Sequence, residues 1–257
     1  MSAQAQAHDG VGGQAPSLAE VIDRWLYVLM ALCLIAVILL GFVPDSFARI
    51  ADIDAVGRAP FLWEAHFHAL TMASWMALLL TQTVLMATGR GGWHMQLGVL
   101  GMVLAPVMVV AGVMLVPAVF ESRIADIEAA GPAGQAELAE ALRNMTNTVL
   151  VQLRAGFCFL VLAIAALVAR RRDAGLHKRL MILATIAPIG GALARMPFLW
   201  RTPPEAPTST LLWPAICVVP MLLWDIYRQR AIHRDYWIFL AVTVSTGVAV
   251  AFLWNSA

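Results

Sequence analysis

Four histidines lie beside long apolar runs of this chain, and their type and position suggest metal chemistry. His66 and His68 lie at the start of one run, and His94 and His177 each open another. The last two have related surroundings, Trp-His-Met-Gln-Leu-Gly at 93–98 and Leu-His-Lys-Arg-Leu-Met at 176–181. Imidazole is the commonest metal ligand in proteins and titrates near neutral pH. His94, His177 and His68 are therefore candidate ligands of a metal ion or a haem iron. The alternative is a histidine that lies in the headgroup zone and bonds water, which is the main interpretation of His66 and stays open for His94 and His177.

The elements that must position these histidines are predicted to be membrane-spanning helices. With 61% hydrophobic and 13% charged residues, the chain is too apolar for a soluble domain. Several stretches of about 18 or more residues carry no charge, enough for a helix to cross a ~30 Å hydrocarbon core. The sequence thus predicts an all-α, polytopic transmembrane bundle of about seven spans. They are 25–44, 66–88, 97–120, 148–169, 179–199, 211–225 and 237–255, the sixth being short and interrupted by two prolines.

Residues 25–257 are expected to form one transmembrane domain, preceded by a disordered cytoplasmic tail at 1–24. The start of the tail lacks the basic region of a signal peptide, so the first span is expected to stay in the protein. Cys33, Cys158 and Cys217 are isolated, and the absence of Cys-x-x-Cys-His excludes ordinary covalent c-type haem attachment. A net charge of +1 without a basic stripe gives no indication of a nucleic-acid partner.

Basic residues indicate the orientation. If the N-terminus is cytoplasmic, the inner segments hold Arg24, Arg90, Arg170–Arg172, Lys178, Arg179, Arg228, Arg230 and Arg234. The outer segments hold only Arg49, Arg58, Arg123, Arg143 and Arg201. The positive-inside rule therefore predicts a cytoplasmic N-terminus and an outer C-terminus, in a membrane that fits the bacterial inner membrane.

The connections suggest a weak tandem repeat. Segments 45–65 and 121–147 are predicted outer loops, the second containing a short amphipathic helix from Gln135 to Arg143, and 170–178 is a tight inner loop. Spans 2–3 and 4–5 each consist of a helix, a short inner loop with arginine, and a second helix opened by histidine. His94 and His177 are therefore expected on the same, inner side.

Helical spacing assigns further residues to these faces. From His68, steps of three and four residues place Trp75 and Gln82 on one stripe. Each has an ordinary alternative, because Trp75 can serve packing alone and Gln82 can bond a neighbouring helix. From His94 the same steps give Gly98 and Gly101, small residues that admit either another helix or a flat ligand.

Two arginines lie within predicted spans toward the outer side. Arg154 is about two turns inside span 4, and Arg195 lies near the end of span 5. A charged residue costs roughly 2.5–3.5 kcal/mol at a helix centre on insertion scales, and no acid of comparable depth is evident in the spans. Either these side chains extend to the outer headgroups, or they meet an anion from outside the chain. Such an anion would be a haem propionate, a lipid phosphate or a substrate carboxylate.

These motifs together resemble an uncharacterised family of bacterial multi-span membrane proteins. The likeness rests on His68-x3-Met-x2-Trp75-x6-Gln82, on Trp-His94-x2-Leu-Gly98 and on His177-Lys-Arg-Leu-Met, and it covers spans 2 to 5. The resemblance implies no activity.

More distantly, the chain resembles haem-b membrane cytochromes, which hold two bis-histidine haems near opposite membrane faces. On the outer side this chain offers only His66 and His68, which point to different sides of one helix, so a two-haem conduit is not expected.

Three classes of function follow from these observations. In the first, a redox protein, His94 and His177 ligate one haem b or a metal ion, with Gly98 and Gly101 leaving room for the macrocycle. A variant of this class places a metal or quinone-like ligand in an outer pocket of His68, Arg154 and Arg195.

The second class is a non-enzymatic assembly, scaffold or sensing protein. The third is a transporter whose fifth span is broken by Pro188, Gly190 and Gly191. No residue is assigned a catalytic role. The expected partners are the lipid bilayer and, in the first class, a redox or membrane-complex partner.

Overall fold

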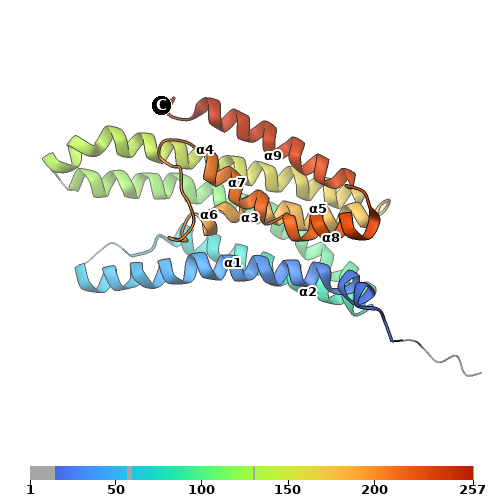
Figure 1. Cartoon of the computed structure of the whole chain (residues 1–257). Helices are drawn as coiled ribbons and strands as arrows, with labels where there is room; N and C mark the ends of the chain where they lie inside the picture. The colour runs from blue at the N-terminus through green and yellow to red at the C-terminus, as the bar shows by residue number, and fades with distance from the viewer. Residues whose placement is uncertain (1–14, 57–59, 130, 257) are drawn as a thin grey trace, which may run out of the picture.

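The computed structural model describes residues 15–56, 60–129 and 131–256, which form helices and turns without any strand. The predicted all-α fold is confirmed (Figure 1). In chain order the elements are α1 (Leu18–Val56), α2 (Trp63–Ala87), α3 (Gly91–Ala129), α4 (Pro132–Ala169), α5 (Ala174–Ile186), the 3₁₀ turn η1 (Ala187–Ile189), α6 (Gly190–Leu193), α7 (Thr208–Ile216), α8 (Val219–Gln229) and α9 (Arg234–Leu253). Most of the predicted tail, residues 1–14, lies outside the described residues.

Five of the described helices are long and apolar enough to cross a membrane, namely α1, α2, α3, α4 and α9. The pair α7 and α8, bent by 43° where they join, makes a sixth candidate if it forms one broken span. The protein is therefore an integral membrane protein. The predicted span 179–199 is not among these candidates, because it consists of the 13-residue α5, the turn η1 and the four-residue α6.

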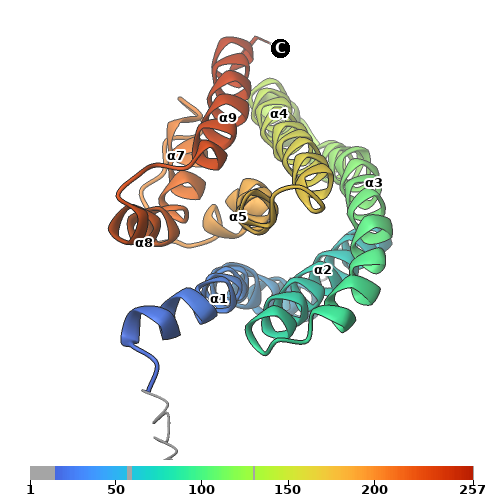
Figure 2. The same ribbon diagram turned by 90° about the vertical axis from the view of Figure 1, so that its right-hand side faces the viewer.

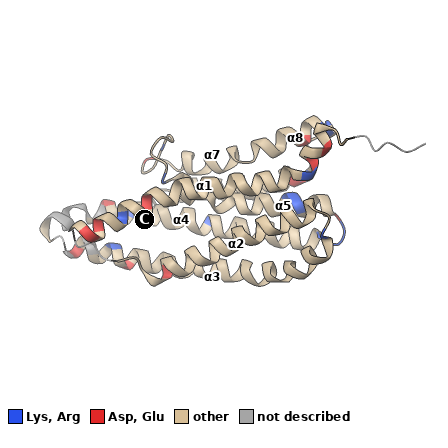
Figure 3. Ribbon diagram, turned by 90° about the horizontal axis from the view of Figure 1, so that it is seen from below, with Lys and Arg blue, Asp and Glu red and all other residues tan. Residues whose placement is uncertain are grey.

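Three helices extend well beyond the thickness of a membrane. α1 and α3 have 39 residues each and α4 has 38, which at 1.5 Å per residue gives about 58 Å, nearly twice a ~30 Å hydrocarbon core. Most of the two predicted outer loops is thus helical: α1 continues through Val56, and 135–143 belongs to α4. Charged residues gather at the two ends of the bundle, and its middle is almost uncharged (Figure 3).

Local sequence explains where several helices begin and break. Ser17 and Glu20 form a capping box at the start of α1, with the backbone N–H of Glu20 donating to Ser17 Oγ. Gly131 has a φ of 65°, which glycine adopts without strain, and Pro132 then opens α4. Pro188 lies in η1, so the predicted break in the fifth predicted span is present.

The helix order gives the bundle two distinct ends. At one end, here called the hairpin end, lie the start of α1 and the turns that join α2 to α3 and α4 to α5 (Figure 1). At the opposite end, here called the far end, α3 meets α4 and the chain terminates. Seen along its length, the bundle surrounds α5 with the other helices (Figure 2).

The core lies around this central helix. Leu180, Ile182, Leu183 and Ile186 of α5 are almost completely buried, against α4 residues such as Phe159. Large apolar side chains on α1, α3 and α9 point outward, as expected for lipid-facing surfaces. The sequence of α5 is therefore hydrophobic because the helix is buried among other helices, and it need not face lipid on every side.

Candidate functional site

The two histidines that open α3 and α5 lie side by side at the hairpin end. The ring centroids of His94 and His177 are 6.4 Å apart, with an angle of 76° between the rings. Nδ1 of His177 is 2.8 Å from the carbonyl oxygen of Ala166 in α4. Because a carbonyl only accepts, Nδ1 must carry the proton in this contact. The tautomer thus leaves the lone pair of His177 on Nε2, the atom available to a metal.

His94 supplies the second imidazole of this pair. Its Nδ1 atom is buried and has no hydrogen-bond partner, a state that native proteins usually avoid. Among the described residues, no group of three or more His, Cys, Asp or Glu side chains is placed to hold a metal ion. The candidate centre is therefore a two-imidazole pair contributed by two helices, here called the histidine pair.

His68 and Gln82 face α3 at two separate levels of α2. A Cβ atom at Gly112 would lie 3.5 Å from His68 Cε1, and one at Gly98 would lie 3.8 Å from Gln82 Nε2. Nδ1 of His68 and both polar atoms of the Gln82 side chain are buried without partners. At Gly101 the nearest neighbour is also on α2. The glycine stripe of α3 therefore packs against α2, so Gly98 and Gly101 do not supply the predicted room for a macrocycle. A haem on the histidine pair would have to lie on another side of α3.

Trp75 lies in the core. Its indole Nε1 donates to Thr185 Oγ1 of α5 at 3.1 Å, and its ring meets Phe159 of α4 edge-on, with centroids 5.0 Å apart. Only 3% of the residue is exposed. Trp75 thus joins α2 to the centre of the bundle, which supports the packing interpretation of this residue.

Arg195 has a partner within the chain. Its Nε is 3.0 Å from Asp45 Oδ2, its Nη1 donates to the Gly191 carbonyl, and its guanidinium lies over the Phe42 ring at 4.3 Å from the centroid. The expectation that no acid would neutralise it was wrong, because α1 continues past the predicted end of span 1 and carries Asp45 to this position. The pair is exposed, so its contribution to stability is small.

Arg154 contacts a different part of the bundle. Its Nη2 donates to the Thr243 carbonyl oxygen of α9 at 2.9 Å, and its Nε is buried without a partner. The side chains of His68, Arg154 and Arg195 therefore contact α3, α9 and α1 respectively. Each of the three thus has contacts of its own, and the predicted outer pocket that they would share stays a prediction.

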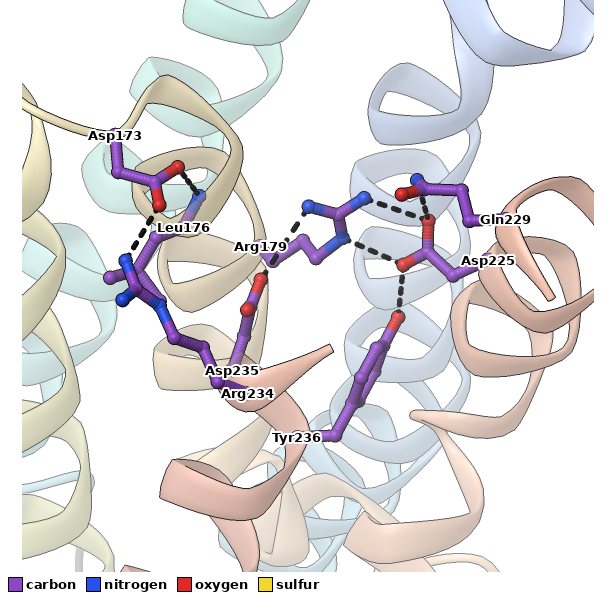
Figure 4. Close-up of polar contacts among 8 residues, drawn as sticks. All are labelled: Asp173, Leu176, Arg179, Asp225, Gln229, Arg234, Asp235 and Tyr236. Atoms are coloured by element: carbon purple, nitrogen blue, oxygen red, sulfur yellow. Dashed lines mark hydrogen bonds and ion pairs between the residues drawn. The ribbon is translucent and has the colours of Figure 1, made fainter. Parts of the chain in front are cut away.

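A buried charged cluster lies near the hairpin end, where α5, α8 and α9 meet (Figure 4). Arg179 of α5 bonds Asp225 of α8 through two contacts, Nε to Oδ2 at 2.7 Å and Nη2 to Oδ1 at 2.9 Å. Arg179 Nη1 also forms an ion pair with Asp235 Oδ2 of α9 at 3.6 Å. Tyr236 donates its hydroxyl to Asp225 Oδ2 at 2.5 Å. We call these four residues the arginine cluster.

The arginine cluster holds more acid than base. One guanidinium faces two carboxylates, and the side chains of Arg179, Asp225 and Asp235 are 7%, 4% and 3% exposed. The Asp225 carboxylate has hydrogen-bond donors on both oxygens, whereas Asp235 Oδ2 has none. The two carboxylates are therefore unequal: Asp225 is fully paired, and Asp235 is held mainly by charge.

Exposed ion pairs surround this cluster. Arg234 Nη2 lies 2.6 Å from Asp173 Oδ2, and Asp23 pairs with Arg228 at the same distance. Asp173 also caps α5, because its Oδ1 accepts from the Leu176 backbone N–H at 2.9 Å. This hydrogen bond, assisted by the charge of Arg234, holds the pKa of Asp173 below its usual value.

The sequence interpretation missed the arginine cluster. Arg179 and Asp225 each stand at the boundary of a predicted span, where a charged side chain normally contacts headgroups and water. Arg179 was also counted among the basic residues of the inner loop. The available signal was weak: Asp225 is an isolated acid at the end of an apolar run, and Asp235 follows ten residues later.

Comparisons with family models, with curated proteins and with solved structures found no match to this chain.

Proposed function

We propose that this integral membrane protein holds one haem b through His94 and His177 and takes part in electron transfer. The observation that carries the proposal is the distance of 6.4 Å between the two ring centroids. With metal–nitrogen bonds of about 2 Å, two imidazoles on opposite sides of one ion have ring centres about 6 Å apart. The separation of the pair suits this arrangement.

The donors that the two helices supply also fit a haem iron better than an ion bound by protein alone. A closed structural metal site needs about four protein ligands, whereas a haem iron receives four nitrogens from the macrocycle and needs two more. Nε2 of His177 is free because Nδ1 is held by the Ala166 carbonyl, and such a bond to the far nitrogen is typical of ligating histidines. A bis-imidazole haem has no open iron position, and supplies one-electron transfer.

The same proposal includes a topology of seven passes, in which the six candidate spans are joined by the central segment of α5, η1 and α6. The hairpin end would then lie in the cytoplasm of a bacterial cell. In support, the basic loop 170–172, Arg90 and Arg228 all lie at the hairpin end. Single cysteines placed at Ser17 and Ser256, in a chain without the native cysteines, test the topology. An impermeant maleimide added to intact spheroplasts is expected to label position 256 alone, and labelling of position 17 alone would reverse the orientation.

The function is tested by the visible absorption spectrum of the full chain, purified in a mild detergent from haem-replete cells. A Soret band is expected, with sharp α and β bands after reduction by dithionite. His94→Ala and His177→Ala should each lose the reduced spectrum, because one imidazole then has no partner across the iron. His66→Ala is the matched control, since this histidine is exposed at the other end of the bundle, and it should keep the full spectrum.

Two results would contradict the haem proposal. The first is a colourless, metal-free preparation of a folded, monodisperse protein, which would favour the scaffold or transport classes. The second is a haem spectrum that both alanine variants retain, which would place the iron elsewhere. Metal analysis of the same preparation separates haem iron from an ion held directly by the histidine pair.

A further inference from the structure

An apolar cleft with one charged group in its wall lies between α4, α7 and α9. Its volume is about 300 Å³. The wall is formed by apolar side chains of α7 and α9, together with Arg154 of α4 and Thr243 of α9. The lining residues that carry the argument are Arg154, Ala187, Leu211, Pro214, Thr243 and Gly247. A volume of this size is within the range of small-molecule sites.

The guanidinium of Arg154 is incompletely paired in this cleft. Nη2 donates to the Thr243 carbonyl, whereas Nε is buried and has no acceptor. Within the part of the chain that the structure describes, no carboxylate lies within ion-pair distance of Arg154. A Cβ added at Gly247 would lie 3.4 Å from Leu211 Cδ1 and 3.9 Å from Arg154 Nε, so this glycine lies directly beside the guanidinium. A cation in apolar surroundings is costly without a counter-charge.

The cleft continues to the far end of the bundle. A second hollow, of about 690 Å³, shares Leu211, Ala215 and Ala251 with the first. Its own lining adds Glu205 from the loop before α7, and Trp254 and Asn255 near the end of the chain. The two hollows are therefore neighbours along α7 and α9.

Two helix breaks border the same cleft. Ala187 begins the 3₁₀ turn between α5 and α6, and Pro214 lies in α7 just before its 43° bend toward α8. These breaks meet, because a Cβ at Gly190 would be 3.6 Å from Pro214 Cγ. Interrupted helices are a recurrent way to build ligand sites inside membrane proteins, since non-helical backbone is tolerated there only around protein or a cavity.

We propose that this cleft binds an anionic amphiphile, with a carboxylate or phosphate on Arg154 and an apolar body against α7 and α9. The anion supplies the counter-charge that Arg154 lacks among the described residues, and charge-assisted hydrogen bonds of guanidinium to these groups are strong. The apolar walls accept a hydrocarbon chain. A phospholipid or fatty acid of the membrane and an organic anion entering from the far end share this chemistry. The site is independent of the histidine pair and of the haem proposal.

Binding of three ten-carbon probes to the purified full chain tests the site. Labelled decanoate and decyl phosphate carry the anion, and decanol is the neutral control. Wild-type protein is expected to prefer both anions to decanol by about tenfold, a ratio suited to one charge-assisted contact. Arg154→Gln should remove this preference. Arg195→Gln is the matched control and should retain it, because Arg195 is already paired with Asp45.

A second variant tests the cleft without changing its charge. Ala251 lines both hollows, so Ala251→Leu should weaken all three probes while leaving Arg154 in place. Equal binding of decanoate and decanol by wild type, or an unchanged preference in Arg154→Gln, would overturn the proposal. The proposal would also be overturned if Ala251→Leu bound every probe with the affinity of the wild-type protein.

Mass spectrometry of the intact protein released from its native membrane distinguishes the two sources. A phospholipid or fatty-acid adduct that Arg154→Gln lacks would identify the ligand as a membrane lipid. Wild-type protein that carries no lipid adduct, yet binds decanoate with the expected preference, would identify an organic anion from the aqueous phase. Each result supports the anion site, and a lipid adduct that Arg154→Gln retains counts against it.

Discussion

Replacing Arg179 by methionine removes the cation that Asp225 and Asp235 share. Methionine keeps most of the apolar length of the side chain and loses both hydrogen bonds to Asp225, of 2.7 and 2.9 Å. It also leaves two carboxylates, 4% and 3% exposed, close to each other in the protein interior. Removing one partner of a buried ion pair costs about 3–5 kcal/mol. We expect Arg179→Met to lower the free energy of unfolding by about that amount.

The two acids are expected to respond unequally. Asp225→Asn removes an acceptor that is bonded on both oxygens, yet Asp235 remains to balance Arg179, so the expected loss is about 1–3 kcal/mol. Asp235→Asn removes the surplus negative charge, and its Oδ2 has no hydrogen bond to lose. We expect that variant to stay within about 1 kcal/mol of wild type. Asp23→Asn, in an exposed pair with Arg228, is the matched control and should change stability by about 0–1 kcal/mol.

Thermal unfolding in a mild detergent at pH 7, followed by circular dichroism, measures these differences. For a chain of this size about 2–4 °C corresponds to 1 kcal/mol, so Arg179→Met should melt on the order of 10 °C below wild type. The expected order of loss is Arg179→Met, then Asp225→Asn, then Asp235→Asn. An Arg179→Met protein that melts with wild type would refute the reasoning. A melting temperature of Asp235→Asn as low as that of Arg179→Met would also refute it, because the two carboxylates would then be equivalent.

Two more predictions concern packing and pH. Gly41→Ala should strongly lower the melting temperature, because the new Cβ would lie 2.3 Å from the Ala192 backbone oxygen. The control Gly156→Ala, whose Cβ would have nothing within 4 Å, should be neutral or stabilising. Equal melting temperatures of the two variants would contradict this contact. Asp173→Ala should lower the melting temperature at pH 7, because its carboxylate caps α5 at Leu176. The folded-state pKa of Asp173 is depressed, so this stabilisation is fully present above the unfolded-state pKa of about 3.9 and is lost as the pH falls from there through the lower folded-state pKa. A difference in melting temperature between wild type and Asp173→Ala that stays constant from pH 7 to pH 3 would exclude the carboxylate as its source.

Much of the membrane architecture could be predicted from the sequence because it follows from local composition. Charge-free runs located five of the candidate spans and the broken pair α7–α8, and Pro188 located the break after α5. The relation between His94 and His177 could also be predicted, since two helical hairpins that turn at the same end of the bundle place their second helices in the same direction. The lengths of α1, α3 and α4 were underestimated, because polar residues beyond a predicted span were interpreted as loops, whereas the helices continue through them.

Contacts between helices were less predictable, because hydropathy and helical period do not identify which neighbour a face meets. Trp75 shares a stripe with His68 and Gln82, yet it packs on α4 and α5 while the other two face α3. Arg195 was expected to lack an acid, and the extension of α1 supplies Asp45.

The sequence by itself determined that the chain is an all-α membrane protein and that His94 and His177 open parallel helices. Those properties depend on the free energy of placing each residue in lipid and on the periodicity of a helix. Only the tertiary structure decided that the histidine rings lie 6.4 Å apart, that Arg179 meets two acids and that Arg154 lines a cleft. Each of these features joins residues from helices far apart in the chain, and depends on how α3, α4, α5, α7, α8 and α9 pack around one another.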